Sequence, residues 1–269
     1  EAELLAYKRA GEAAGSETSK ASRTQGGPFT ITAGDGVDDL TIGGNAFITN
    51  GVFTAGSFTT ALGNTLSVTA YNAGTGVVSY TYTLLDNEAH AAANGENALF
   101  ENFAVHLTDT DTGVADSTLS VRIVDDVPTA EADVDKTTSG TANGNVILGT
   151  GMTGGVADIA GADGLASPAV VGVSTSAGSI TDGTGVGGVV ASAKGTLTLG
   201  ADGAFTYTKT DAEATGTDTF YYTIIDKDGD PSTTTLTIVL DGEPHITNLT
   251  PEADGGDVSV DEDDLLASR

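Results

Sequence analysis

The chain has 269 residues, no cysteine, and 10 basic against 38 acidic residues, which gives a formal net charge of −28. Such a surface repels nucleic-acid phosphates and anionic lipid, and the lack of cysteine excludes disulfides and thiolate metal sites. The length allows two domains with cores of their own, and no apolar run reaches the roughly 18 residues that a membrane-spanning helix needs.

In chain order, the first element is a short helix at the N-terminus, predicted from Leu4 and Leu5 in a run of good helix formers that ends near Gly15. A polar, glycine-rich loop follows, up to Pro28. Short strands separated by turns then predict a first β-sandwich, which together with the helix makes up a module over 1–127.

Within this first module the clearest strand is 77–84. Its apolar residues alternate with serine and threonine, which places one set on the core face and the other on the outer face. Turn residues 72–76 are expected to join it to a preceding strand at 66–71.

A second module is predicted over 128–242. Its hairpin at 195–209 repeats the pattern of the first module, with a turn at Ala201-Asp202-Gly203. The glycine-rich stretch 149–188 is expected to run over the surface between short strands. Residues 243–269 read as a linker and the start of a further repeat, because Glu262-DDLLASR resembles Glu1-AELLAYK.

An acidic loop occurs twice, at 103–128 and at 220–244. Each copy has an alternating strand, an Asp-x-Asp turn, a second alternating strand, further acidic residues and a proline. Carboxylates this close repel one another unless a cation lies between them, and calcium prefers six to eight such oxygens. The predicted ligands are Asp109, Asp111, Asp116, Asp125, Asp126, Asp226, Asp228, Asp230, Asp241 and Glu243.

The returning strand of each module is expected to bring its terminal acids beside the loop of that module. The loops are not EF-hands, because Pro231 and Thr237 stand where that motif needs Gly and Glu. The alternative is that these aspartates cap turns and are solvated, or that the acidity only reflects a saline environment. Six further acids are weaker candidates: Asp86, Glu88, Glu96, Glu101, Asp133 and Asp135.

The sequence does not favour an enzyme. Its histidines, His90, His106 and His245, are scattered, and His106 lies within a predicted strand. No nucleophile elbow and no His-Glu-x-x-His pair is present. The two Gly-x-Gly-x-x-Gly matches, near 149–154 and 183–188, precede no helix and are expected by chance among 37 glycines.

The segment 201–240 resembles the VCBS-type and bacterial Ig-like repeats of giant type I-secreted adhesins of the repeats-in-toxin (RTX) class. Residues 103–130, with Leu107-TDTDTG and Val124-DDVPTA, look like the agglutinin-type repeats of the same adhesins. The resemblance implies an all-β fold of tandem Ig-like or cadherin-like sandwiches, with calcium held by the Asp-x-Asp loops. It also implies that the acidic residues around the linkers, Asp125, Asp126, Asp241 and Glu243, share ions between modules. The first loop departs from the pattern, with Thr112 before Gly113 and its third acid delayed to Asp116.

In that family such modules are extenders, which are calcium-stiffened spacers that hold a ligand-binding region away from the cell in adhesion and biofilm formation. We therefore expect an extracellular, cell-surface chain that contacts neighbouring repeats, is monomeric as a fragment, and binds neither nucleic acid nor membrane. The alternative is an adhesin module that binds carbohydrate or protein through the loop 86–102, where His90–Asn97 is an insertion relative to the second module.

Overall fold

The computed structural model describes residues 15–16, 23–92, 95–242, 250 and 256. These residues form strands and turns without any helix, so this part of the chain is all-β, as predicted. The described segments hold no helix of the length and apolar character that crossing a membrane requires. The helix predicted at the N-terminus falls in 1–14, outside the described residues.

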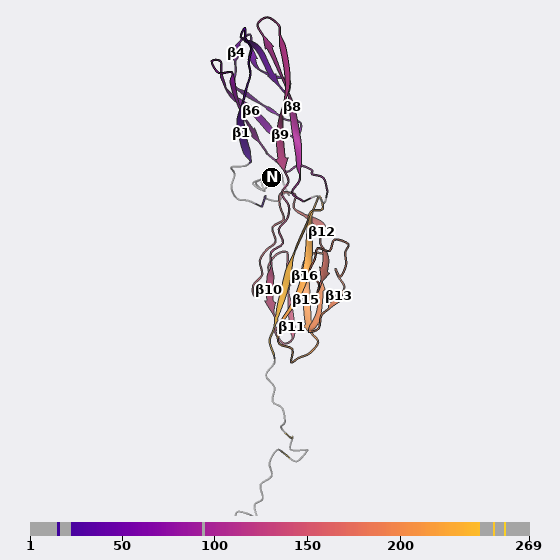
Figure 1. Ribbon diagram of the computed structural model, residues 1–269. Helices are drawn as coiled ribbons and strands as arrows, with labels where there is room; N and C mark the ends of the chain where they lie inside the picture. Colours follow the sequence, from indigo (N-terminus) through magenta and orange to yellow (C-terminus); the bar gives the residue numbers. More distant parts are fainter. Residues whose placement is uncertain (1–14, 17–22, 93–94, 243–249, 251–255, 257–269) are drawn as a thin grey trace, which may run out of the picture.

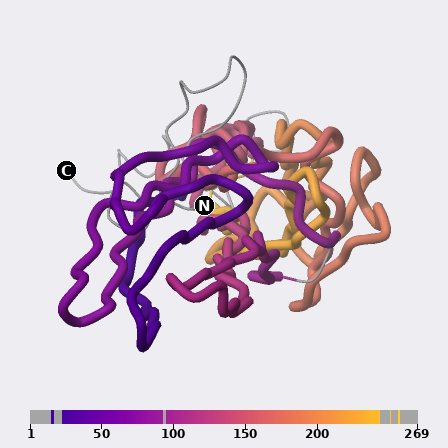
Figure 2. The backbone as a smooth tube through the Cα atoms, turned by 90° about the horizontal axis from the view of Figure 1, so that it is seen from above, coloured from indigo at the N-terminus to yellow at the C-terminus, as the bar shows by residue number. Residues whose placement is uncertain are grey.

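The strands form two β-sandwiches stacked end to end (Figure 1). We call them module one (β1 to β9) and module two (β10 to β17). Seen from above, the purple part of the chain lies mainly on the left and the orange part on the right, and the two overlap in part near the middle (Figure 2). The division falls between Val124 and Asp133; the boundary predicted at 127/128 lies in that interval and stays a prediction.

Module one has sheets of strand order β1-β7-β6-β5 and β4-β3-β2-β8-β9. Its strands are β1 (Thr24–Thr30), β2 (Val37–Ile42), β3 (Asn45–Thr49), β4 (Val52–Phe53), β5 (Gly56–Thr59), β6 (Thr65–Asn72), β7 (Val77–Thr83), β8 (Ala98–Asp109) and β9 (Val114–Val124).

Module two has sheets of strand order β10-β17-β16-β12 and β11-β15-β14-β13. Its strands are β10 (Asp133–Lys136), β11 (Thr141–Asn145), β12 (Leu165–Ser174), β13 (Val189–Ala191), β14 (Gly195–Leu199), β15 (Ala204–Lys209), β16 (Gly216–Asp226) and β17 (Pro231–Leu240).

The two modules share one pairing scheme. The hairpins β8–β9 and β16–β17 correspond, as do β6–β7 and β14–β15; β1 and β11 each pair with the second strand of the latter. The predicted turns are confirmed: Gly76 N donates to Asn72 O at 2.8 Å, and Gly203 N donates to Gly200 O at 3.0 Å. The exceptions are β3 and β4, which extend the sheet beyond β2 in module one, and β10, which pairs in parallel with β17 in module two.

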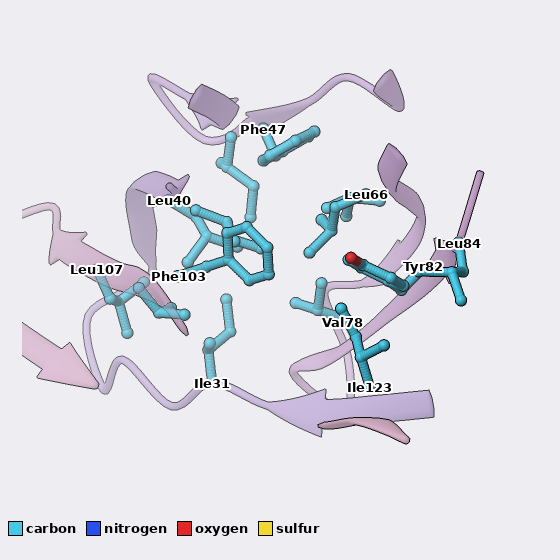
Figure 3. Packing of buried hydrophobic residues seen from close by; sticks show 14 of the residues in the cluster. Ile31, Leu40, Phe47, Leu66, Val78, Tyr82, Leu84, Phe103, Leu107 and Ile123 are labelled. Carbon is cyan, nitrogen blue, oxygen red and sulfur yellow. The ribbon is translucent and has the colours of Figure 1, made fainter. Parts of the chain in front are cut away.

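Each module encloses an apolar core between its sheets. In module one the alternation of 77–84 is confirmed, since Val78, Tyr82 and Leu84 are buried. Figure 3 shows these side chains facing Leu40 and Phe103 from the opposite sheet. In module two the corresponding core gathers Leu197, Tyr207, Phe220, Tyr222, Ile224 and Leu236.

A tyrosine–carboxylate hydrogen bond joins the two sheets of each sandwich. Tyr82 of β7 donates to Glu101 Oε2 of β8 at 2.7 Å, and Tyr207 of β15 donates to Asp218 Oδ2 of β16 at 2.9 Å. All four residues are buried. A buried carboxylate needs such donors, because water cannot solvate it there.

One part of module two differs from the prediction. The stretch 149–188 contains a ten-residue strand, β12, whose pairing with β16 is interrupted by register shifts. Pro168 lies within it, and proline is tolerated because β12 is an edge strand.

Candidate metal centre

The two Asp-x-Asp turns fold alike because the first aspartate binds the backbone of the turn. Asp226 Oδ1 accepts the N–H groups of Gly229 and Asp230 at 3.0 and 2.7 Å. Asp109 Oδ1 accepts those of Asp111 and Gly113 at 3.2 and 2.6 Å. In both turns, further carboxylate oxygens then lie close enough together to be candidate ligands of one ion.

The expectation that each module's terminal acids lie beside its own loop is wrong. The loop at 109–113 and the acids Asp125 and Asp126 are at opposite ends of β9, which has 11 residues and so spans roughly 35 Å. In the same way β17 separates the loop at 226–230 from Asp241. Instead, the loop of module two lies beside the acidic end of module one, where Asp125 approaches Asp228 and Asp230.

At this joint two groups of carboxylates overlap. Asp125, Asp228 and Asp230 form one group, and Asp163, Asp226 and Asp228 form the other. Within each group the candidate ligand oxygens lie within 4.8 Å of one another, and Asp228 belongs to both. Four of the predicted ligands are thus brought together from two modules.

The joint leaves buried oxygens without partners. Among the described residues five carboxylate oxygens here are buried and accept no hydrogen bond: Asp163 Oδ2, Asp226 Oδ2, both oxygens of Asp228, and Asp230 Oδ2. Asp226 and Asp230 are fully buried, and Asp163 is 5% exposed. Buried polar groups are nearly always paired, and a bound cation or a proton would compensate these oxygens.

The pKa values point in the same direction. Burial raises the pKa of Asp226 to about 8 and that of Asp125 to about 6, with the neighbouring Asp228 adding to both. Burial also raises the pKa of Asp163. His90 and Lys227 oppose the shift at Asp163. The charged forms are therefore under-compensated by the protein itself.

The inserted loop of module one packs against this centre. Gly95 N donates to Asp230 Oδ1 at 2.6 Å, and Asn87 Nδ2 donates to Asp163 Oδ1 at 2.6 Å. Asn97 contacts Asp125 and lies 3.1 Å from His90 Nδ1. These contacts use the loop that the alternative hypothesis assigns to ligand binding.

Asp126 anchors the joint rather than facing the centre. Its Oδ2 accepts the N–H groups of Ser16 and Ala162, both at 2.8 Å, and its Oδ1 accepts the Ser16 hydroxyl at 2.5 Å. Ala162 belongs to module two, yet it packs into the core of module one. The modules therefore share a packed interface beside the carboxylates.

A second acidic group lies at the opposite end of module one. Asp35, Asp109 and Asp111 approach within the same 4.8 Å limit, but this group is largely exposed. A side-chain hydrogen bond between the Asp109 and Asp111 carboxyls lowers the pKa of Asp109 and raises that of Asp111. Water can solvate these exposed carboxylates, so their negative charge depends less on a bound ion for compensation.

The other predicted residues do not join a group. Asp116 lies in β9 and pairs with His106 Nδ1 at 2.6 Å. Asp241 is exposed at the far end of module two, and Glu243 is outside the described residues. Most of the weaker candidates serve the fold: Glu88 accepts from Asn64, Glu101 from Tyr82, Asp133 from Tyr222 and Val156, and Asp135 from Thr153.

Sequence reasoning missed Asp35 and Asp163. Both lie in turns just before a strand that pairs with the hairpin carrying the acidic loop, β2 for Asp35 and β12 for Asp163. The shared signal is an aspartate beside Gly, at Gly34-Asp35-Gly36 and Asp163-Gly164. It becomes informative only once the strand pairing is known.

Comparison with known proteins gives a family match for one part of the chain. Residues 125–239 match the family described as "Bacterial Ig domain". The chain therefore contains an Ig-like repeat, formed by module two and the acidic pair before it. No curated protein matches the chain.

Solved structures give only distant likenesses. The N-terminal eight Ig domains of Down Syndrome Cell Adhesion Molecule align at 13% identity and a TM-score of 0.26, over 84% of this chain and 23% of that one. An endo-fucoidan hydrolase of glycoside hydrolase family 107 aligns at 15% identity and a TM-score of 0.25, over 86% of this chain and 31% of that one. The Bacteroides ovatus mixed-linkage glucan utilization locus protein SGBP-B, in complex with a heptasaccharide, aligns at 12% identity and a TM-score of 0.18, over 81% of this chain and 41% of that one. The chain thus spans less than half of each, and likenesses of this size carry no argument about its function.

Proposed function

We propose that this chain is an extender segment of a bacterial cell-surface adhesin and that calcium stiffens the joint between its modules. The observation that supports this is the set of five buried, unpartnered carboxylate oxygens contributed from loops at the meeting of two modules. Bacterial Ig-like domains are commonly extracellular or surface-exposed, which agrees with such a role. The resemblance to repeats of RTX adhesins, which are type I-secreted, gives the finer assignment.

Calcium suits the donor set better than other common ions. The centre offers carboxylate oxygens from turns, with no thiolate, and calcium accepts six to eight oxygens in irregular geometry. Magnesium requires tight octahedral geometry and retains its waters. The residues that would hold the ion are Asp125, Asp163, Asp226, Asp228 and Asp230. When bound, a divalent cation supplies the positive charge that these carboxylates lack.

The mechanical consequence follows from where the carboxylates come from. Asp125 ends module one, whereas the other ligands belong to module two. With an ion present, separating or bending the modules would expose uncompensated charge, so the joint resists bending. Extracellular calcium modules bind with Kd of about 10⁻⁴–10⁻³ M. The joint would therefore be stiff outside the cell and less constrained inside it.

The experiment is calorimetric titration of calcium into the chain, paired with small-angle scattering in calcium and in chelator. We expect saturable binding and a narrower distribution of dimensions in calcium. Asp228→Asn, which removes the residue shared by both groups, should weaken binding at least tenfold. The exposed Asp211→Asn serves as the matched control and should bind as the unaltered chain does.

Two outcomes would overturn the proposal. One is the absence of calcium binding at moderate salt. The other is full replacement of calcium by potassium chloride, which would indicate a general saline adaptation. Glycan-array binding by the chain would instead favour the alternative role of a carbohydrate-binding module, although the 87–97 loop is already engaged at the joint.

A further inference from the structure

Two overlapping groups of carboxylates lie at the joint, and each has the dimensions of one calcium coordination sphere. Calcium–oxygen distances are about 2.3–2.6 Å, so two oxygens on the same ion are at most about 5 Å apart. The candidate oxygens of Asp125, Asp228 and Asp230 lie within 4.8 Å of one another, and so do those of Asp163, Asp226 and Asp228. Among the described residues no group of this size contains all five, so a single ion would not bind them all.

Buried oxygens without a partner occur in both groups. In the first group Asp230 is fully buried, and its Oδ2 accepts no hydrogen bond within the described part of the chain. In the second group Asp226 is fully buried and Asp163 nearly so, and the Oδ2 of each likewise lacks a partner. An ion in one group alone would leave buried, unpaired oxygens in the other, which is rare in folded proteins.

Asp228 belongs to both groups. Its two carboxylate oxygens are both buried and without a hydrogen-bond partner among the described residues, so it can give one oxygen to each of two ions. When ionised, the five carboxylates of the joint carry five negative charges. One divalent ion balances two of these charges and a pair of ions balances four. Because an uncompensated buried charge is costly, the pair suits the joint better.

The two groups differ in the modules that they connect. Asp125 follows β9 of module one, whereas the other two ligands of its group lie in the turn between β16 and β17, so this group crosses the joint. The second group draws its carboxylates from module two alone. There Asp163 precedes β12, and Lys227 N donates to Gly164 O at 3.1 Å, which joins the turn before β12 to the acidic turn. An ion in the first group would link the modules, and an ion in the second would brace module two.

We propose that the joint holds two calcium ions and that Asp228 bridges them. Asp125 and Asp230 complete the ligands of the ion that links the modules, and Asp163 and Asp226 complete those of the ion within module two. The inference rests on the proposed calcium role of the joint. It adds the number of ions, and it assigns the stiffening of the joint to only one of them.

Lanthanide luminescence of the full chain tests for two neighbouring ions. Terbium and europium replace calcium at sites made of oxygen ligands, and excited terbium transfers energy to europium efficiently only when the two ions are neighbours. With both metals bound, we expect europium emission when terbium is excited. Asp125→Asn and Asp163→Asn should each abolish this emission, because each removes a ligand of one ion only. Asp211→Asn, at an exposed position, is the matched control and should retain it.

Calorimetric titration and small-angle scattering in calcium then distinguish the two ions. Asp125→Asn and Asp163→Asn should each lose one bound calcium per chain, and the double variant should lose two. Only Asp125→Asn should also lose the narrower distribution of dimensions in calcium. A melting curve for each variant verifies that it folds.

The outcomes separate this inference from the proposed function. If the unaltered chain binds calcium but shows no energy transfer, or if the double variant loses only one ion, the joint holds a single ion and only the inference is overturned. Absence of calcium binding would overturn both.

Discussion

Gly95 of module one donates its backbone N–H to the fully buried carboxylate of Asp230 in module two, at 2.6 Å. The bond ties the inserted loop of one sandwich to the acidic turn of the next. It satisfies one oxygen of Asp230, while the other remains without a partner. The position of the Asp230 carboxylate at the joint is therefore fixed by a hydrogen bond, whereas its negative charge is not balanced.

The substitution Asp230→Asn distinguishes the contribution of this hydrogen bond from that of the negative charge. The amide oxygen can still accept from Gly95, so the contact between modules is retained while one negative charge is removed. In chelator we expect the variant to be more stable than the unaltered chain by about 1–3 kcal/mol, since an uncompensated buried charge is lost. In 10 mM calcium this advantage should shrink by about 1.4–2.7 kcal/mol, because a site with Kd of 10⁻⁴–10⁻³ M stabilises the unaltered chain by that amount through linkage.

Thermal melts in the two buffers measure how the stability difference between the variant and the unaltered chain changes with calcium. Asp211→Asn is again the control and should shift neither curve, because Asp211 is exposed and its side chain accepts the local Glu213 N–H, which an amide oxygen can also accept. If Asp230→Asn destabilises equally in both buffers, the role of Asp230 is structural and not that of a ligand.

The hydrogen bonds of Tyr82 and Tyr207 support a second prediction. Tyr82→Phe leaves Glu101 buried without its tyrosine donor, and Tyr207→Phe removes the same donor from Asp218. We expect each change to cost about 1–3 kcal/mol, because the carboxylate loses a partner that water cannot replace. Tyr80→Phe, at a half-buried tyrosine that packs on Phe29, should cost less. Urea unfolding measures all three, and equal losses would contradict this account.

Thr112 occupies the left-handed region with φ of 73°, where Gly229 stands in the other acidic turn with φ of 100°. A β-branched residue is strained there, and glycine is not. Thr112→Gly should therefore stabilise module one by about 1 kcal/mol despite the added freedom of the unfolded chain.

The neighbouring position gives the contrasting variant. A Cβ added at Gly113 would lie 2.7 Å from Asp109 Oδ2, so Gly113→Ala should destabilise the same turn. Chemical denaturation compares the two, and a stabilising effect of both would show that the turn itself is not the source of the strain.

The sequence predicts most of the fold because its signals are local. The alternation of Val78, Tyr82 and Leu84 and the turn at Ala201-Asp202-Gly203 both require only near neighbours in the chain. The strand β12 was hidden because Pro168 and Gly172 interrupt its apolar pattern, and only pairing with the long strand β16 holds it extended.

The candidate site was less predictable because it depends on which end of a strand each residue occupies. Asp125 and Asp228 are 103 positions apart and meet only because two modules stack end to end. Asp163 carries no motif of its own. Conversely, Asp116 reads as part of the first acidic turn, but the register of β8 and β9 places it opposite His106.

The last prediction concerns pH and lies away from the joint. Asp158 accepts the Glu131 N–H at 2.7 Å and lies 3.2 Å from the Tyr222 hydroxyl. Burial raises its pKa to about 7, above the value of about 3.9 expected in the unfolded chain. The folded state thus favours the protonated form. Its contribution is complete below about pH 4 and is lost as the pH rises toward 7.

Asp158→Asn should abolish this dependence, since its amide keeps the acceptor for Glu131 and carries no charge. We expect the variant and the unaltered chain to have similar stability near pH 4, and the variant to be more stable at pH 8 by at least about 1 kcal/mol. Asp211→Asn, at an exposed position, should keep the slope of the unaltered chain. Denaturant unfolding at several pH values, all in chelator so that metal binding does not contribute, measures the difference. If the variant and the unaltered chain differ in unfolding free energy by the same amount at pH 4 and pH 8, the substitution acts through packing and Asp158 is not the titrating group.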